Sequence, residues 1–178
     1  MKNIILGIAL VLAANTTLSQ EVCRNYTYEQ NNLLQLAFDR GVDHEYAYTL
    51  AAIVQQESFL GDYVVRINPF DKGGSYGITH ITLSTARDLT GAGHWEGRKV
   101  VEMLVKDDGY ALDLAIKKLL KVQGRSKTFF QLWGNYNGAG PASRQYASKI
   151  LKHVQQFKRC RVFYLDDNLT LWSEKSST

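Results

Sequence analysis

Apolar residues recur three and four positions apart in one segment after another of this 178-residue chain, and most of these segments end at a glycine. That spacing places apolar side chains along one face of an α-helix. A glycine after the last apolar residue often ends a helix, because it adopts left-handed backbone angles without steric cost. The pattern predicts helices at residues 28–40, 43–59, 81–89, 98–105, 108–121, 127–133 and 142–156.

The ends of these helices carry recognisable signals. Asp43 and Asp108 are predicted to cap the starts of the second and fifth helices. Gly41 is predicted to end the first helix, and the stretch "GNYNGAGP" the sixth. Between the second and third helices, a short stretch of β-branched residues followed by turn residues predicts a small hairpin or irregular loop around residues 62–80. The expected fold class is therefore mainly α, in a single domain.

The first residues are typical of an export signal. Lys2 precedes a short apolar run, and small and polar residues follow up to residue 19. We predict a signal peptide at 1–19, a main domain at 20–157 and a C-terminal tail at 158–178. The apolar run is short for a membrane span, so no stable membrane insertion is expected after cleavage, and a permanent anchor is the alternative. The chain is expected in the periplasm or outside the cell.

The chain has two cysteines, Cys23 and Cys160, near opposite ends of the mature protein. An oxidising compartment allows them to form one disulfide that closes a very long loop. In the chain-entropy description such a bond stabilises the fold by roughly 4 kcal/mol. The alternative is two unpaired thiols.

Charge and histidine spacing exclude some classes of function. The formal net charge is +4, but Lys and Arg are dispersed and no nucleic-acid recognition module occurs. A mild basic excess suits a polyanionic surface such as a bacterial envelope. The histidines show no metal-ligand spacing, so no metal site is expected. Trp133, which falls at helical spacing, is predicted to belong to the core.

Glu57 occupies a position where the helical pattern requires an apolar residue. Residues 47, 50, 51, 53 and 54 form the apolar stripe, and the same steps lead to Glu57. An ionised carboxylate without a partner is costly to bury, and the last turn of a helix disfavours negative charge. We therefore expect this carboxyl to stay protonated at neutral pH, as a general acid must. The alternative is that Glu57 lies at the surface or pairs with Arg66.

Three short motifs occur in an order typical of a known enzyme family. They are Glu57-Ser58, the stretch "SYGITH" at 75–80, and "NYNGAGP" at 135–141. Together they resemble soluble (SLT-type) lytic transglycosylases of the lysozyme-like superfamily, which place "ES" on a helix before "GLMQ" and then "AYN" with a glycine-rich turn. "DDGYALDLAIKKLL" and "RQYASKIL" resemble the family segments on either side of the last motif. The resemblance covers about residues 29–154.

The resemblance implies a lysozyme-like α+β fold, peptidoglycan glycan strands as the partner, and no cofactor. Glu57 would be the catalytic acid and base, with Ser58 and Tyr136 positioning it. The residues that would line the groove and contact the sugar are Ser75, Thr79, His80 and Asn137. Phenol and amide groups suit this task, because they can hydrogen-bond a carboxyl and a carbohydrate.

His80 departs from the family, which usually has glutamine at this position. A neutral imidazole also offers one donor and one acceptor, so sugar binding can survive with a changed geometry. A protonated His80 would lose its acceptor and, if close, would help to ionise Glu57. The pH dependence of the activity is therefore expected to differ from that of the family.

The implied reaction cleaves the β-1,4 bond between N-acetylmuramic acid and N-acetylglucosamine and forms a 1,6-anhydro product with a single Glu. One alternative is hydrolysis, as in the related goose-type lysozymes, with Asp62 or Asp71 holding a water. Another is a non-catalytic glycan-binding component of the envelope or of a secretion machine. The mass of the product separates the first two, because an anhydro end is lighter by one water.

Overall fold

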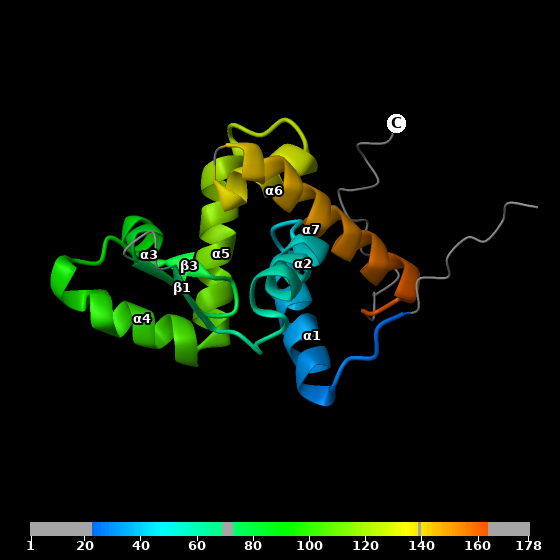
Figure 1. Ribbon diagram of the computed structural model, residues 1–178, viewed down its shortest axis with the longest axis horizontal. Coiled ribbons are helices and arrows are strands. Elements are labelled where there is room, and N and C mark those ends of the chain that lie inside the picture. Colours follow the sequence, from blue (N-terminus) through cyan, green and yellow to red (C-terminus); the bar gives the residue numbers. More distant parts are fainter. Residues whose placement is uncertain (1–22, 69–72, 139, 164–178) are drawn as a thin grey trace, which may run out of the picture.

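The computed structural model describes residues 23–68, 73–138 and 140–163, which fold into α-helices and one small sheet (Figure 1). The helices are α1 (Tyr28–Val42), α2 (Ala47–Ser58), α3 (Leu83–Thr90), α4 (Gly97–Lys106), α5 (Asp108–Gln123), α6 (Phe129–Asn137) and α7 (Pro141–Cys160), with a short 3-10 turn at His94–Glu96. The strands are β1 (Val65–Asn68), β2 (Gly73–Tyr76) and β3 (Ile81–Thr82). The predicted mainly α class is confirmed. The proposed signal at 1–19 lies outside the described residues.

The first two helices pack closely together because of a glycine. The prediction that Gly41 ends the first helix is wrong, since α1 continues to Val42 and Gly41 is buried inside it. A Cβ atom at Gly41 would lie 2.7 Å from the backbone of Tyr46 and Ala47, so its absence allows the chain to turn tightly into α2. Asp43 does not cap α2. Tyr46 occupies that position without a side-chain hydrogen bond.

The predicted hairpin is present, and a third strand extends it. β1 pairs antiparallel with β2, with Val65 opposite Tyr76, and β2 pairs antiparallel with β3, with Tyr76 opposite Ile81. Residues 81 and 82 were predicted as the start of a helix. They form β3 instead, and Thr82 then caps α3 by accepting a hydrogen bond from the Thr85 backbone. α3 ends at Gly91, which has a left-handed φ of 72°, one residue after the last helical residue Thr90.

Several predicted boundaries in the second half differ from the structure. Asp107, not Asp108, caps α5, because its side chain accepts a hydrogen bond from the Tyr110 backbone. α6 does not stop after Trp133. It runs on to Asn137, with Gly134 buried inside the helix and lying close to the Ser143 backbone of α7. The motif "NYN" is therefore the last turn of a helix.

The helix α5 stands between two parts of the molecule. In Figure 1, α3, α4 and the sheet lie on one side of α5, and α1, α2 and α7 lie on the other. The apolar stripe of α2 is fully buried, and Trp133 is in the core as predicted, with 7% of its surface exposed. Trp95, in contrast, is 91% exposed on the 3-10 turn.

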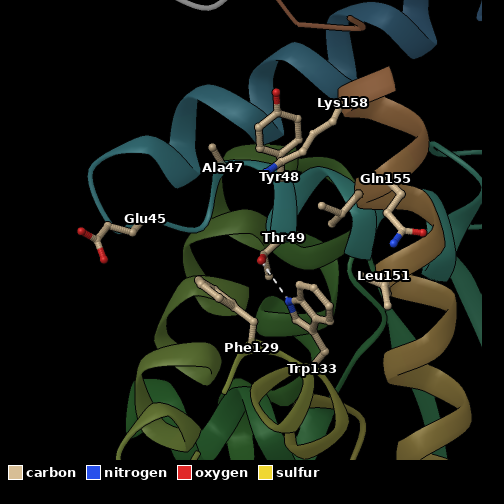
Figure 2. A pocket seen from close by; sticks show the side chains of 10 residues that line it. Glu45, Ala47, Tyr48, Thr49, Phe129, Trp133, Leu151, Gln155 and Lys158 are labelled. Carbon is tan, nitrogen blue, oxygen red and sulfur yellow. Dashed lines mark hydrogen bonds between the residues drawn. The ribbon is translucent and has the colours of Figure 1, made fainter. Parts of the chain in front are cut away.

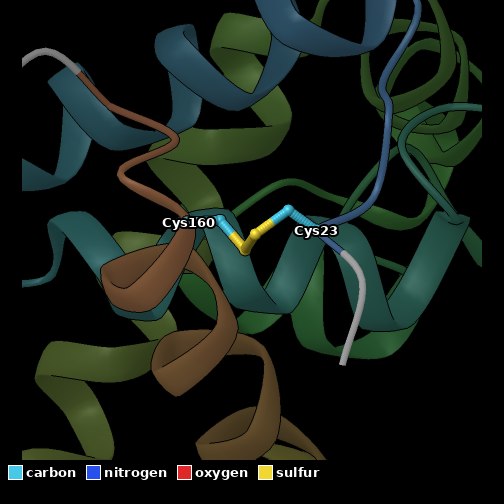
Figure 3. The surroundings of a disulfide bond; sticks show 2 residues. All are labelled: Cys23 and Cys160. Atoms are coloured by element: carbon cyan, nitrogen blue, oxygen red, sulfur yellow. A yellow bond between two sulfur atoms is a disulfide. The ribbon is translucent and has the colours of Figure 1, made fainter. Parts of the chain in front are cut away.

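The predicted disulfide between Cys23 and Cys160 is confirmed (Figure 3). It joins the segment before α1 to Cys160, the last residue of α7. This helix therefore continues four residues past its predicted end at residue 156. Beyond it, Phe163 stacks on Phe38 with ring centroids 4.3 Å apart. Of the predicted tail, Val162 and Phe163 are not in a strand, and residues 164–178 lie outside the described residues.

Candidate active site

A groove of about 740 Å³ opens between the sheet, α3, α5 and the ends of α2 and α6. Its lining residues are Glu57, Arg66, Gly73, Gly74, Ser75, Tyr76, His80, Thr82, Leu83, Ser84, Arg87, Lys118 and Asn137. Glu57 is the single carboxylate among these described lining residues. The remaining polar side chains are hydroxyls, an amide, an imidazole and cations, which suits a hydroxylated ligand.

Glu57 lies in the last turn of α2, and the helix ends directly after Ser58 because the backbone changes to left-handed angles. Phe59 and Leu60 both adopt left-handed angles, with φ of 51° and 64°, and Gly61 follows with φ of 90°. Ser58 stabilises this ending, because its hydroxyl donates to the Val54 carbonyl at 3.1 Å and accepts from the Gly61 amide at 3.0 Å. The helix end therefore holds Glu57 at the groove, with 13% of its side chain exposed.

Tyr146 from α7 makes the shortest contact with Glu57. Its phenol donates a hydrogen bond to Glu57 Oε1 at 2.7 Å. Burial raises the pKa of the Tyr146 phenol well above its usual value, and the negative charge of Glu57 raises it further. The phenol therefore keeps its proton throughout the neutral range and acts only as a donor to Oε1.

His80 reaches the other carboxyl oxygen. Its Nδ1 lies 3.4 Å from Glu57 Oε2, and only 6% of its side chain is exposed. Its Nε2 lies 2.7 Å from the Tyr63 carbonyl oxygen. The backbone of His80 is left-handed, with φ of 46°, a conformation that histidine adopts more often than most residues and that is frequent at functional sites.

Two buried hydrogen bonds from Thr79 and Tyr136 fix the turn that carries His80. The Thr79 hydroxyl donates to the Ala111 carbonyl of α5 at 3.1 Å, and the Tyr136 phenol of α6 donates to the Thr79 carbonyl at 3.2 Å. The Tyr136 and Tyr146 rings stack with centroids 6.4 Å apart. Burial also raises the pKa of the Tyr136 phenol well above its usual value. Both phenols therefore remain neutral donors beneath the groove.

Lys118 from α5 brings a positive charge close to Glu57. Its Nζ lies 4.0 Å from the centroid of the Tyr136 ring, a cation–π distance. Burial lowers the pKa of the Lys118 ammonium to about 8, although the negative charge of Glu57 acts in the opposite direction. Lys118 is thus charged at pH 7 and loses that charge in mildly alkaline solution.

The structure brings some of the predicted residues into the groove and leaves others beneath it. Ser75, His80 and Asn137 line the groove together with Glu57. Ser58, Thr79 and Tyr136 are at most 1% exposed, and their hydroxyls are bonded to the backbone. These three residues support the helix end and the His80 turn and do not reach the groove. Asp62 is exposed and is not among the lining residues.

Sequence reasoning missed Tyr146, Lys118, Arg66 and Arg87 as residues of the site. Lys118 carried a usable signal, because it falls on the apolar stripe of α5 between Leu114 and Leu119, as Glu57 does on α2. Tyr146 lies in "RQYASKIL", one of the segments that resemble the family, but its spacing alone is that of an ordinary core aromatic.

A second, smaller cavity of about 250 Å³ lies at the other end of α2 (Figure 2). It is bordered by Ala47, Thr49, Phe129 and Trp133, and its Thr49 hydroxyl already accepts the Trp133 indole N–H at 3.0 Å. Thr49 precedes Glu57 by about 12 Å along the helix axis. This cavity is therefore separate from the groove that contains the carboxyl.

Comparisons with protein-family models, with curated proteins and with solved structures found no match to this chain. Among the helices of residues 23–68, 73–138 and 140–163, none has both the length and the apolar character needed to cross a membrane.

Proposed function

We propose that this protein is a peptidoglycan lytic transglycosylase with Glu57 as its single acid and base. One observation carries the proposal: Glu57, the single carboxyl among the described groove residues, is held by a phenol on one oxygen, faces an imidazole on the other, and lies in a groove large enough for sugar rings. The resemblance of the motifs around Glu57, His80 and Asn137 to soluble lytic transglycosylases supports the same reaction.

The reaction needs one proton donor that later becomes an acceptor. Glu57 protonates the oxygen between N-acetylmuramic acid and N-acetylglucosamine while the bond from that oxygen to the anomeric carbon breaks, with assistance from the substrate acetamido group. The 6-hydroxyl of the same muramic acid then attacks the anomeric carbon and returns its proton to Glu57. No water is consumed, and the product carries a 1,6-anhydro ring.

The hydrolytic alternative requires a second carboxylate that holds a water molecule or attacks the anomeric carbon. Asp62, one of the two residues considered for this role, is exposed and is not among the groove-lining residues. Asp71 lies outside the described residues. Among the described lining residues Glu57 is the single carboxylate, which favours the transglycosylase over the muramidase.

Mass spectrometry of the products released from purified cell-wall sacculi tests the proposal. We expect muropeptides with 1,6-anhydro ends, each lighter by one water than the corresponding reducing-end product. Reducing ends would instead establish a muramidase. Binding to sacculi without any released product would overturn both enzymatic assignments and leave a glycan-binding protein.

The charge of the groove supports an anionic glycan as the substrate. Arg66, Arg87 and Lys118 line it, and none of the ion pairs found among the described residues involves them. Glycan strands of peptidoglycan carry carboxylates on the muramic acid or its peptide, whereas polymers of N-acetylglucosamine alone are neutral. We therefore propose that the protein prefers peptidoglycan to neutral chitin-type chains.

The charge on Lys118 makes substrate binding depend on pH. Because the pKa of Lys118 is about 8, its positive charge is present at pH 7 and mostly lost at pH 9. We expect the KM for soluble glycan fragments to rise several-fold over this interval. Lys118→Arg, which stays charged, should flatten the rise, and Lys117→Arg on the exposed face of the same helix should leave it unchanged. An equal rise in all three proteins would contradict a role for Lys118.

We also propose that the protein works outside the cytoplasm, in the periplasm or cell envelope. The predicted signal peptide and the disulfide between Cys23 and Cys160 support this location, because structural disulfides persist in oxidising compartments.

A further inference from the structure

The hydrogen bond to Tyr63 determines which nitrogen of His80 carries a proton. A carbonyl oxygen can only accept, so His80 Nε2, 2.7 Å from the Tyr63 oxygen, must be the donor. The neutral ring then has a hydrogen on Nε2 and a lone pair on Nδ1. Nδ1 can carry a hydrogen only when the whole ring is a cation.

That lone pair faces the carboxyl of Glu57. Nδ1 is buried, has no hydrogen-bond partner among the described residues, and lies 3.4 Å from Glu57 Oε2. An imidazole lone pair and a carboxylate at this distance repel each other unless one proton lies between them. The separation is longer than a tight hydrogen bond, as is common for catalytic contacts before the substrate binds.

We propose that Glu57 and His80 share a single proton between Oε2 and Nδ1, and that His80 is the positioning residue that keeps this proton available to Glu57. The pair is then neutral in the resting protein, whichever of the two atoms carries the proton. Its loss leaves a carboxylate beside a neutral imidazole.

The surroundings direct the proton to this side of the carboxyl. Tyr146 from α7 already donates to Oε1, so Oε2 is the oxygen left for the shared proton. Lys118 from α5 and Arg66 from β1 add positive charge, which favours the carboxylate, while the His80 lone pair favours the acid. Tyr136 from α6 stays neutral beneath them.

In the proposed reaction, on which this step rests, the shared proton goes to the glycosidic oxygen as its bond to the anomeric carbon breaks. A carboxylate and a neutral imidazole remain. When the bond between the 6-oxygen and the anomeric carbon forms, the hydroxyl proton returns to the pair. A glutamine in place of His80 cannot hold this proton at any stage.

Nitrogen NMR of the histidine rings tests the pair independently of activity. We expect a neutral His80 to have its hydrogen on Nε2, and the pH at which His80 titrates to fall by at least one unit in Glu57→Gln. His44 and His94 are exposed, and the pH at which each titrates should be the same in the two proteins. Burial lowers the pKa of His153 to about 4, which separates its signal from that of His80.

An unchanged His80 titration in Glu57→Gln, or a neutral ring with its hydrogen on Nδ1, would overturn the inference. A dispersed amide spectrum of the variant confirms that it is folded. This outcome is independent of the proposed function, since a wild-type protein that releases no glycan fragments could still show the coupled titration.

A pH profile of wall lysis provides the second readout. A pair loses its shared proton at higher pH than a lone carboxyl in the same place, so His80→Gln should move the alkaline limb of the profile at least one pH unit toward acid. His44→Gln is the matched control and should retain the wild-type profile. An alkaline limb at the same pH in His80→Gln and wild type would contradict the shared proton.

Discussion

Glu57→Gln is expected to lower the rate of glycan release from sacculi by roughly a hundred-fold to ten-thousand-fold, the range typical of a lost general acid and base. The amide has nearly the same shape, and its oxygen can still accept the Tyr146 hydrogen bond. It cannot donate a proton to the leaving oxygen or take one from the 6-hydroxyl. Glu57→Gln should therefore lower kcat strongly and change KM little.

A control for this substitution is available on α4. Glu102 is exposed and pairs with Lys106 at 2.7 Å, a surface contact of small energetic value. Glu102→Gln should lyse walls at the wild-type rate. Thermal unfolding of both variants shows whether the fold is intact. Equal lysis by Glu57→Gln and wild type would remove Glu57 from the chemistry and, with it, the proposed function.

Removal of the disulfide is expected to have the largest effect on stability. Cys23 and Cys160 are 137 residues apart, and a cross-link over such a distance greatly restricts the unfolded chain. For this separation of 137 residues the chain-entropy description gives about 5 kcal/mol, somewhat more than the roughly 4 kcal/mol expected from the sequence. For Cys23→Ser/Cys160→Ser we therefore expect a lower free energy of unfolding by about that amount, and a Tm lower by roughly 10 to 20 °C.

Guanidinium denaturation of the wild type and the double variant measures this difference. A reducing agent should destabilise the wild type to a similar extent and leave the double variant unchanged, which separates the effect of the bond from that of the serine side chains. A difference below about 1 kcal/mol would mean that the unfolded chain is already restricted without the cross-link.

The sequence predicted the helices better than it predicted their ends. Apolar spacing located all seven α-helices of the described residues, because a helix must bury one face to be stable. Local end signals were less reliable. Asp43 and Gly41 have the right chemistry for a cap and a stop, but the close approach of α1 and α2 uses Gly41 inside the helix. Gly134 misled the prediction of α6 for the same reason, since it allows close packing against α7.

The site was predictable where a polar residue interrupts an apolar stripe. Glu57 was found in this way, and Lys118 carries the same signal on α5. Tyr146 was not predictable from spacing, because an aromatic ring on the buried face of α7 is consistent with ordinary core packing. Its phenol becomes part of the site only when α7 crosses the end of α2, which no local pattern encodes.

The bond between Cys23 and Cys160 has a further consequence for the survival of the protein. It makes the chain from residue 23 to residue 160 a covalent ring, and this ring contains Glu57, His80, Lys118 and Tyr146. A protease that cuts one exposed turn within the ring produces a nicked protein whose two pieces remain attached. In an environment that contains proteases, the disulfide and the packing of the core together keep the two pieces of such a molecule attached.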